Sequence, residues 1–302
     1  MASKDRIQRQ NNSLRRKKTK RWLGILLALL IFVSGCLGVL QWGVYYTETH
    51  WEHWYPDYEK IDLQPILDKE TLNEADYETL YRQTGLTRLA IDDMLAENNT
   101  ADIIQIQNFL FKRQEVQIRR FNPFTYMEEI DDYAIFTTLR DGDIIVSATT
   151  RVSWWRYGHA ALVVDGKKEL LLESFGPGEK SEYSDAATFT YLANFMVLRP
   201  KADEETKKQI VDYANTNLVG LPYRFSIGVF YKKYKEKITR TQCAHLVWYA
   251  YKKFGIDLDS NGGAIVKPQD IALSPHVELV QAYGFHLDRL WTKQNVSPKE
   301  FS

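Results

Sequence analysis

The fold is decided by the stretch Gly158-His159-Ala160-Ala161-Leu162-Val163-Val164-Asp165-Gly166-Lys167-Lys168-Glu169-Leu170-Leu171-Leu172-Glu173-Ser174. Two short apolar runs flank the turn-forming tripeptide 165–167, so the stretch predicts an antiparallel β-hairpin. With a three-residue turn, Val164 pairs with Lys168. His159 then lies directly opposite Glu173 on the same face. A two-residue turn would send Glu173 to the other face as an ordinary solvent-side carboxylate.

The segments on both sides of this hairpin indicate the fold class. Residues 139–147 predict a turn followed by a short buried strand, and residues 195–198 predict another strand. A helix follows, which Asp203 caps and Gly220 ends. Strands first and helices later favour an α+β fold with a small, mostly antiparallel sheet packed on helices.

The next predicted helix begins at Cys243 and ends before Gly255. Its apolar residues fall on one helical stripe, so the helix is expected to be buried. Cys243 lies in the first turn, where the partial positive charge of the helix N-terminus favours the nucleophilic thiolate. The alternative is a buried structural thiol. The only other cysteine is Cys36, which lies in an apolar segment, so the C-terminal part has no cysteine pair for a disulfide.

A thiolate nucleophile needs a base and a group that orients the base. His245 is only two residues from Cys243, so it points around the helix and is expected to be packing or surface. His159 is the better base, because it begins an otherwise apolar strand, and Glu173 is its expected partner. His159 as a hydrogen-bonded core histidine remains the alternative.

Four motifs in this order resemble one known family, the circularly permuted NlpC-like papain-fold cysteine hydrolases of the YiiX and YaeF type, which are related to lecithin retinol acyltransferases. The motifs are Gly142-Asp143-Ile144-Ile145, residues 158–164, Gly220-Leu221-Pro222-Tyr223-Arg224-Phe225, and Cys243-Ala244-His245-Leu246-Val247 with Gly255-Ile256-Asp257-Leu258. The resemblance covers about residues 137–285 and predicts a permuted papain-like catalytic domain over residues 131–302.

The resemblance implies Cys243 as nucleophile, His159 as base and Glu173 as the group that orients the imidazole. Tyr223 matches a tyrosine that helps to hold the oxyanion; its alternative is a packed aromatic residue. Ala244 and His245 depart from the family pattern, which leaves the substrate pocket open. Aromatic residues just before His159 are expected either to line the cleft or to pack the loop: Trp154, Trp155 and Tyr157.

The N-terminal part has the charge pattern of a membrane anchor. Residues 1–21 contain nine basic residues and one acidic residue, whereas the rest of the chain contains 30 basic and 38 acidic residues. Residues 22–46 are uncharged and long enough to span a bilayer. The positive-inside rule then predicts a cytoplasmic tail (1–21), a transmembrane helix (22–46) and an extracytoplasmic remainder. The basic run is interpreted as topology, so no nucleic-acid partner is expected. Val33-Ser34-Gly35-Cys36 resembles a lipobox, so a lipoprotein anchored at Cys36 is the alternative.

Residues 47–130 predict a helical accessory region outside the membrane. A capping box formed by Thr71 and Glu74 predicts one helix that Gly85 ends, and a second helix begins at Thr100. His50 and His53 have a possible metal spacing but no third ligand, so neither a metal nor a cofactor is expected.

These predictions together favour a membrane-anchored bacterial cysteine amidase or peptidase that acts on amide bonds of the cell envelope, such as those of peptidoglycan peptides. Acyl transfer on lipids or lipoproteins by the same fold is an alternative, and a non-catalytic envelope-binding module is another. The oligomeric state is left open.

Overall fold

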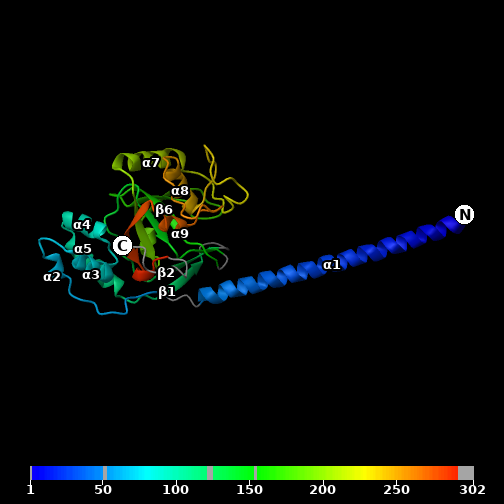
Figure 1. The fold of residues 1–302 in the computed structure, drawn as a ribbon, viewed down its shortest axis with the longest axis horizontal. Helices are drawn as coiled ribbons and strands as arrows, with labels where there is room; N and C mark the ends of the chain where they lie inside the picture. The colour runs from blue at the N-terminus through cyan, green and yellow to red at the C-terminus, as the bar shows by residue number, and fades with distance from the viewer. Residues whose placement is uncertain (1, 50–52, 121–124, 153–154, 292–302) are drawn as a thin grey trace. The chain divides into compact units, whose positions relative to one another are not determined.

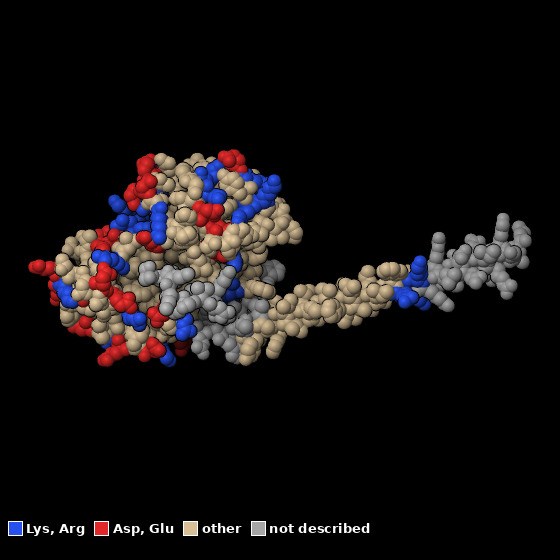
Figure 2. Space-filling view, in the orientation of Figure 1, with Lys and Arg blue, Asp and Glu red and all other residues tan. Residues whose placement is uncertain are grey.

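The computed structural model describes residues 2–49, 53–120, 125–152 and 155–291, which divide into two compact units on either side of residue 51. The first unit is one helix, α1 (Ala2–Thr49). Its segment Lys18–Gly43 has 26 residues and is long and apolar enough to cross a membrane. Figure 2 shows the apolar stretch as an uninterrupted tan segment next to blue Lys and Arg side chains. The expectation of a membrane-spanning length of helix here is confirmed.

The second unit is built around a six-stranded antiparallel sheet, in the order β10-β9-β3-β6-β7-β8. Figure 1 labels β6, one of its two middle strands. The α+β fold with antiparallel sheets is therefore confirmed, as are the strands predicted from residues 144–147, 158–174 and 195–198. The strands of this sheet are β3 (Ile144–Ser147), β6 (His159–Asp165), β7 (Leu170–Glu173), β8 (Glu182–Asp185), β9 (Phe195–Pro200) and β10 (Val277–Tyr283).

Helices cover both faces of this sheet, and the strand residues alternate between two buried apolar clusters. Ala160 and Leu162 face the first cluster, whereas Ala161 and Val163 face the second. The first cluster contains α7 (Glu204–Asn217), α8 (Cys243–Lys252) and α9 (Pro268–Ala272). The second contains α3 (Glu74–Thr84), α4 (Arg88–Ala96), α5 (Thr100–Leu110) and α6 (Ala187–Thr190). Because both faces are covered, the central strands are buried along almost their whole length.

The central hairpin β6–β7 has a different register from the predicted one. Glu173 pairs with Ala161 rather than with His159, so the prediction of a directly opposite pair was wrong by two residues. The chain turns through residues 166–169, and an extra residue, Val164, forms a β-bulge. The longer turn and the bulge together shift the register by an even number. His159 and Glu173 therefore stay on the same face as diagonal neighbours.

Residues 47–130 are not helical throughout, which corrects the predicted accessory region. The helical part contains α2 (Gln64–Leu67), α3, α4 and α5, and it ends with α5 at Leu110. Two strands follow, β1 (Val116–Arg120) and β2 (Thr125–Ile130). These strands join β4 (Arg151–Val152) and β5 (Trp155–Arg156) in a four-stranded antiparallel sheet. The pairing of β2 with β4 joins segments that are far apart in the chain, so local sequence patterns do not reveal it.

The ends of the accessory helices follow the predicted rules with one shift. The capping box of α3 is formed by Asn73 and Asp76, not by Thr71 and Glu74, because Asn73 precedes the first helical residue. Each of the two side chains accepts a 3.0 Å hydrogen bond from the backbone N–H of the other residue. Gly85 ends α3 in the left-handed conformation, and α5 begins at Thr100, as predicted.

A buried ion cluster connects the accessory helices to the sheet. Arg199 in β9 donates hydrogen bonds of 2.9 and 2.8 Å to the two carboxylate oxygens of Asp143, and one of 2.6 Å to Asp93 in α4. Asp143 belongs to the first motif of the predicted family. Its observed partners give it a structural role in the resting protein.

Candidate active site

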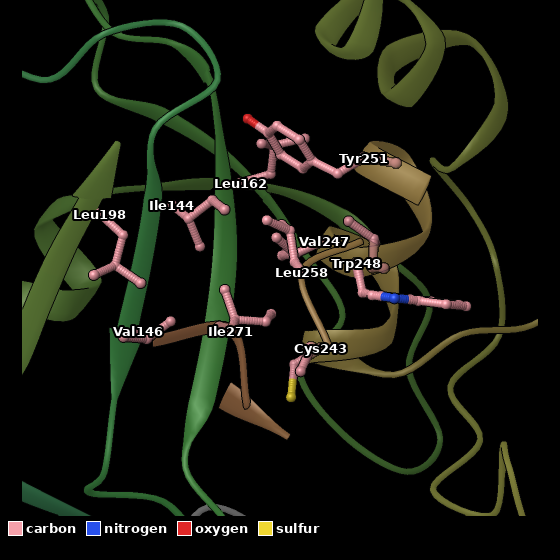
Figure 3. Packing of buried hydrophobic residues seen from close by; sticks show 14 of the residues in the cluster. Ile144, Val146, Leu162, Leu198, Cys243, Val247, Trp248, Tyr251, Leu258 and Ile271 are labelled. Atoms are coloured by element: carbon pink, nitrogen blue, oxygen red, sulfur yellow. The ribbon is translucent and has the colours of Figure 1, made fainter. Parts of the chain in front are cut away.

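Cys243 is the first residue of α8, the helix at the centre of the first apolar cluster (Figure 3). All residues from 243 to 251 are buried, as the apolar stripe predicted. Figure 3 shows the sulfur at the end of this cluster, beyond Val247 and Trp248 of the same helix. The thiol is therefore at the positive end of a helix dipole, and it is only 2% exposed.

Gln242 caps this helix, a role that the sequence analysis missed. Its Oε1 accepts hydrogen bonds from the Ala244 N–H (3.1 Å) and the Cys243 thiol (3.3 Å), and its Nε2 donates to the Val266 carbonyl (2.8 Å). Glutamine is not among the preferred N-cap residues, so the only signal was its place directly before the helix. In the resting protein the Ala244 N–H is thus occupied by a side chain and is not a ready oxyanion donor.

His159 and Glu173 form a buried pair at the start of β6 and the end of β7. The His159 Nε2 and the Glu173 Oε2 lie 2.5 Å apart. The imidazole also packs against two phenylalanine rings, Phe175 at 5.0 Å and Phe189 at 5.5 Å between centroids. This packing and the hydrogen bond fix the ring orientation, which a base in acyl transfer requires.

Cys243 lies near enough to His159 to raise the pKa of the imidazole. Strict alternation gives His159 the face of Ala161, whereas α8 packs on the opposite face. His159 is the first residue of its strand, so its side chain lies at the end of the sheet, where Cys243 still raises its pKa. Gly158, with φ of +84°, leads into this position, and a Cβ there would lie 2.5 Å from the Ser147 carbonyl oxygen.

The electrostatics of the pair favour an imidazolium next to a carboxylate. Burial lowers the pKa of His159, but the interaction with Cys243 and the hydrogen bond and charge of Glu173 raise it from 6.5 to about 10. Burial raises the pKa of Glu173, but the hydrogen bond and the charge of His159 bring it below 4.5. At neutral pH the pair therefore holds a proton on His159 and a negative charge on Glu173.

Two tyrosines lie beside Cys243. Burial and the charge of Cys243 raise the pKa of both Tyr223 and Tyr157, so both phenols stay protonated at neutral pH. The Tyr157 hydroxyl donates to the Val266 carbonyl at 3.1 Å. Tyr223 is held by backbone pairing with Thr241, two residues before the cysteine. Trp155 is 58% exposed, and Trp154 lies outside the described residues.

His245 is a packing residue, as expected from its position on the helix. Its Nε2 donates to the Lys233 carbonyl (2.7 Å), and its Nδ1 accepts from the Thr241 hydroxyl (3.0 Å). Burial lowers the pKa of His245 to about 4, so the ring is neutral at physiological pH.

The structure thus brings together Cys243, His159, Glu173 and Tyr223, the four predicted site residues. Within the described ranges, no group of three or more His, Cys, Asp or Glu side chains could hold a metal ion, and His50 of the possible metal pair lies outside those ranges. The chain matches no protein-family model, no curated protein and no solved structure.

Proposed function

We propose that this chain is a membrane-anchored extracytoplasmic cysteine hydrolase that cleaves amide bonds of the cell envelope by Cys–His acyl transfer. The observation that supports it is the buried hydrogen bond between His159 and Glu173, two strand residues, together with the influence of Cys243, at a helix N-terminus, on the His159 imidazole. A nucleophile, a base and an orienting carboxylate in contact are what thiol-based acyl transfer requires.

The proposed fold is a permuted papain-like domain. In this chain the histidine strand β6 precedes the cysteine helix α8, and β6 and α8 pack through the first apolar cluster. The four motifs of the family resemblance lie at the start of β3, along β6, in the segment before α8, and on α8 with the residues that follow it. This order supports the permuted form over the one in which the cysteine comes first.

In the first half of the proposed reaction, Cys243 gives up its hydrogen bond to Gln242 and reacts as a thiolate beside protonated His159, and its sulfur attacks the carbonyl carbon of the bound amide. The tetrahedral oxyanion accepts hydrogen bonds from the Tyr223 hydroxyl, which the raised pKa keeps protonated, and from the Cys243 N–H. His159 then gives its proton to the departing amine nitrogen, and the C–N bond breaks to leave a thioester on Cys243.

In the second half, a water molecule gives a proton to His159 and attacks the thioester carbonyl. The C–S bond breaks and the carboxylic acid leaves. The sulfur is again a thiolate, and His159 again carries a proton. Glu173 remains ionised throughout and stabilises the imidazolium each time it forms. Because Cys243 is almost fully buried, a substrate reaches the sulfur only after a covering segment moves.

The proposed anchor is the helix segment Lys18–Gly43, with the basic residues on the cytoplasmic side and the second unit outside. The retained helix is preferred over cleavage and acylation at Cys36, because the apolar run continues for ten residues beyond that cysteine to Tyr46.

The test uses the full chain purified in detergent with two substrate sets, peptidoglycan fragments and phospholipids, and mass spectrometry to identify the acyl bond that is lost. The proposal predicts new amine and carboxyl ends in the wall fragments. It also predicts that Cys243→Ser and His159→Ala abolish this turnover, whereas Cys36→Ser retains it. Loss of ester bonds from phospholipids alone would replace the amide substrate with a lipid. Amide cleavage that survives in Cys243→Ser would contradict the mechanism.

A further inference from the structure

The segment before α8 contrasts with the rest of the second unit in charge. Residues 224–240 contain six basic residues and one acidic residue, whereas the chain beyond residue 21 is acidic in total. Lys232, Lys235 and Lys237 are exposed, and they form no ion pair within the described part of the chain. The acidic member, Glu236, is paired with Lys253 outside the segment. We call residues 224–240 the basic–aromatic loop; it is the yellow segment that leads into α8 in Figure 1.

The same loop exposes large apolar side chains at its tip. Phe230 is 83% exposed, the largest fraction for a large apolar side chain among the described residues, and Val229 is 58% exposed. Phe225, Tyr231 and Tyr234 are also exposed. Exposed apolar side chains gathered within ten residues mark an interaction site more often than a chance surface.

Hydrogen bonds hold this tip in a defined conformation. The Gly228 N–H donates to the Tyr231 carbonyl at 2.7 Å, and the Val229 N–H donates to the Ser226 carbonyl at 3.1 Å. Ile227 is buried beneath the tip. Gly228 has φ of +91°, and a Cβ there would lie 1.7 Å from the Ala264 carbonyl oxygen, so only glycine fits. The exposed side chains are therefore presented by an ordered turn.

We propose that the basic–aromatic loop is a second membrane contact, which docks on an anionic lipid bilayer. Apolar tips that enter the interface and surrounding Lys and Arg that bind anionic headgroups are the two signals that stable peripheral binding combines. A polyanion alone would use the lysines but would leave Val229 and Phe230 in water. An apolar protein partner would use the tip but would leave the exposed charges of Lys232, Lys235 and Lys237 without a counterpart.

The loop is also attached directly to the candidate active site. Its two ends are joined by the pairing of Tyr223 with Thr241, and the Phe225 ring contacts the Tyr157 ring at 5.0 Å. Docking of the tip would therefore place the Cys243 site close to the lipid surface. The inference uses the proposed anchor, which keeps the second unit near a bilayer, but it does not depend on the catalytic chemistry.

The test places a polarity-sensitive fluorophore at position 230 of the full chain, in a Cys36→Ser, Cys243→Ser, Phe230→Cys variant. The chain is reconstituted in vesicles of phosphatidylcholine alone or with about one-third phosphatidylglycerol. Spin-labelled lipids in the vesicles quench a fluorophore that enters the interface. A label at exposed Lys168, in the β6–β7 turn, is the matched control position, and circular dichroism reports folding.

The proposal predicts a blue-shifted, lipid-quenched emission at position 230 in the anionic vesicles and solvent-like emission at position 168. The quenched fraction is expected to fall about tenfold when Lys232→Glu, Lys235→Glu and Lys237→Glu are added. High salt is expected to lower the quenched fraction by a similar factor. Lys208→Glu on α7, the control for charge reversal, is expected to leave it unchanged. The proposal would be overturned by solvent-like emission at position 230 or by equal quenching in neutral vesicles. A shift that follows the protein-to-lipid ratio would also overturn it, because it would indicate contact with a second copy of the chain.

Discussion

Two regions of the second unit each bury a histidine, and the two rings have opposite properties. At the start of β6, His159 contacts a carboxylate, and its pKa rises to about 10. On α8, His245 contacts a hydroxyl and a carbonyl, and its pKa falls to about 4. Burial lowers the pKa of both rings, so the partner decides the charge. The comparison teaches that burial of a histidine does not distinguish a site from a core; an ionised partner does.

The two regions also differ in what their hydrogen bonds hold in place. His245 connects the loop at Lys233 to α8, so its contacts stabilise the support of the cysteine helix. His159 and Glu173 connect two strands that already pair through their backbones. The second pair is therefore not needed for strand pairing, which fits a role in chemistry rather than in folding.

The largest effect is expected for the structural histidine. His245→Ala leaves the Lys233 carbonyl without its donor and opens a cavity in α8, so we expect the free energy of unfolding to fall by about 3 kcal/mol. His245→Gln, which can still donate to that carbonyl, is expected to lose less. Denaturant unfolding followed by tryptophan fluorescence measures both changes.

Exposed His276 is the matched control, and His276→Ala is expected to stay within about 0.5 kcal/mol. The pH dependence gives a second check. The pKa of His245 is lower in the folded than in the unfolded chain, so its contribution to stability is present above pH 6.5 and is lost as pH falls towards 4. A His245→Gln protein with the same acid slope as the wild type would contradict this assignment.

The next largest effect is expected at the carboxylate. Glu173→Gln removes the negative charge beside His159, so the pKa of His159 is expected to fall, and the labelling rate of Cys243 by iodoacetamide to fall about 10- to 100-fold. The background is Cys36→Ser, so that only one thiol reacts.

Glu182 lies opposite Glu173 on β8 and is exposed, so Glu182→Gln is the matched control. It removes a neighbouring charge without touching the imidazole and is expected to change the rate less than threefold. Equal rates in Glu173→Gln and the wild type would show that the carboxylate does not act on the Cys–His pair.

The smallest effect is expected at Gln242, the residue between the two regions. Gln242→Ala removes the cap of α8, and we expect a loss of about 1 kcal/mol in the free energy of unfolding with little change in the titration of His159. Gln209→Ala on the exposed side of α7 is the control. A large shift in the His159 titration would mean that the cap, and not Glu173, holds the pair together.

The parts that sequence predicted are those fixed by local pattern. The place of Cys243 in the first turn of a buried helix follows from the apolar stripe and the closing glycine. The shared face of His159 and Glu173 was predicted from a three-residue turn, and it holds because the actual register differs by an even number of residues. The exact register does not follow, because the turn is one residue longer than expected and Val164 adds a bulge.

The parts that sequence did not predict depend on distant segments. The edge strand β10 pairs with β9 across an intervening stretch that includes α7, α8 and α9. Strands β1 and β2 are stabilised by β4, and no local signal marks that partnership. The cap by Gln242 depends on the Val266 carbonyl, which holds the amide in place. Long-range partners of this kind need the folded chain.

The most direct test of the account is an NMR titration of the histidine side chains in the full chain in detergent micelles, with His159→Gln and His245→Gln to assign the resonances. The account predicts that His159 loses its proton near pH 10 and that His245 stays neutral down to about pH 4. It also predicts that the His159 midpoint moves down in Cys243→Ala, because that variant removes a group that raises the pKa of His159. Midpoints near 6.5 for both rings, with no response to Cys243→Ala, would contradict the pairing of His159 with Cys243 and Glu173.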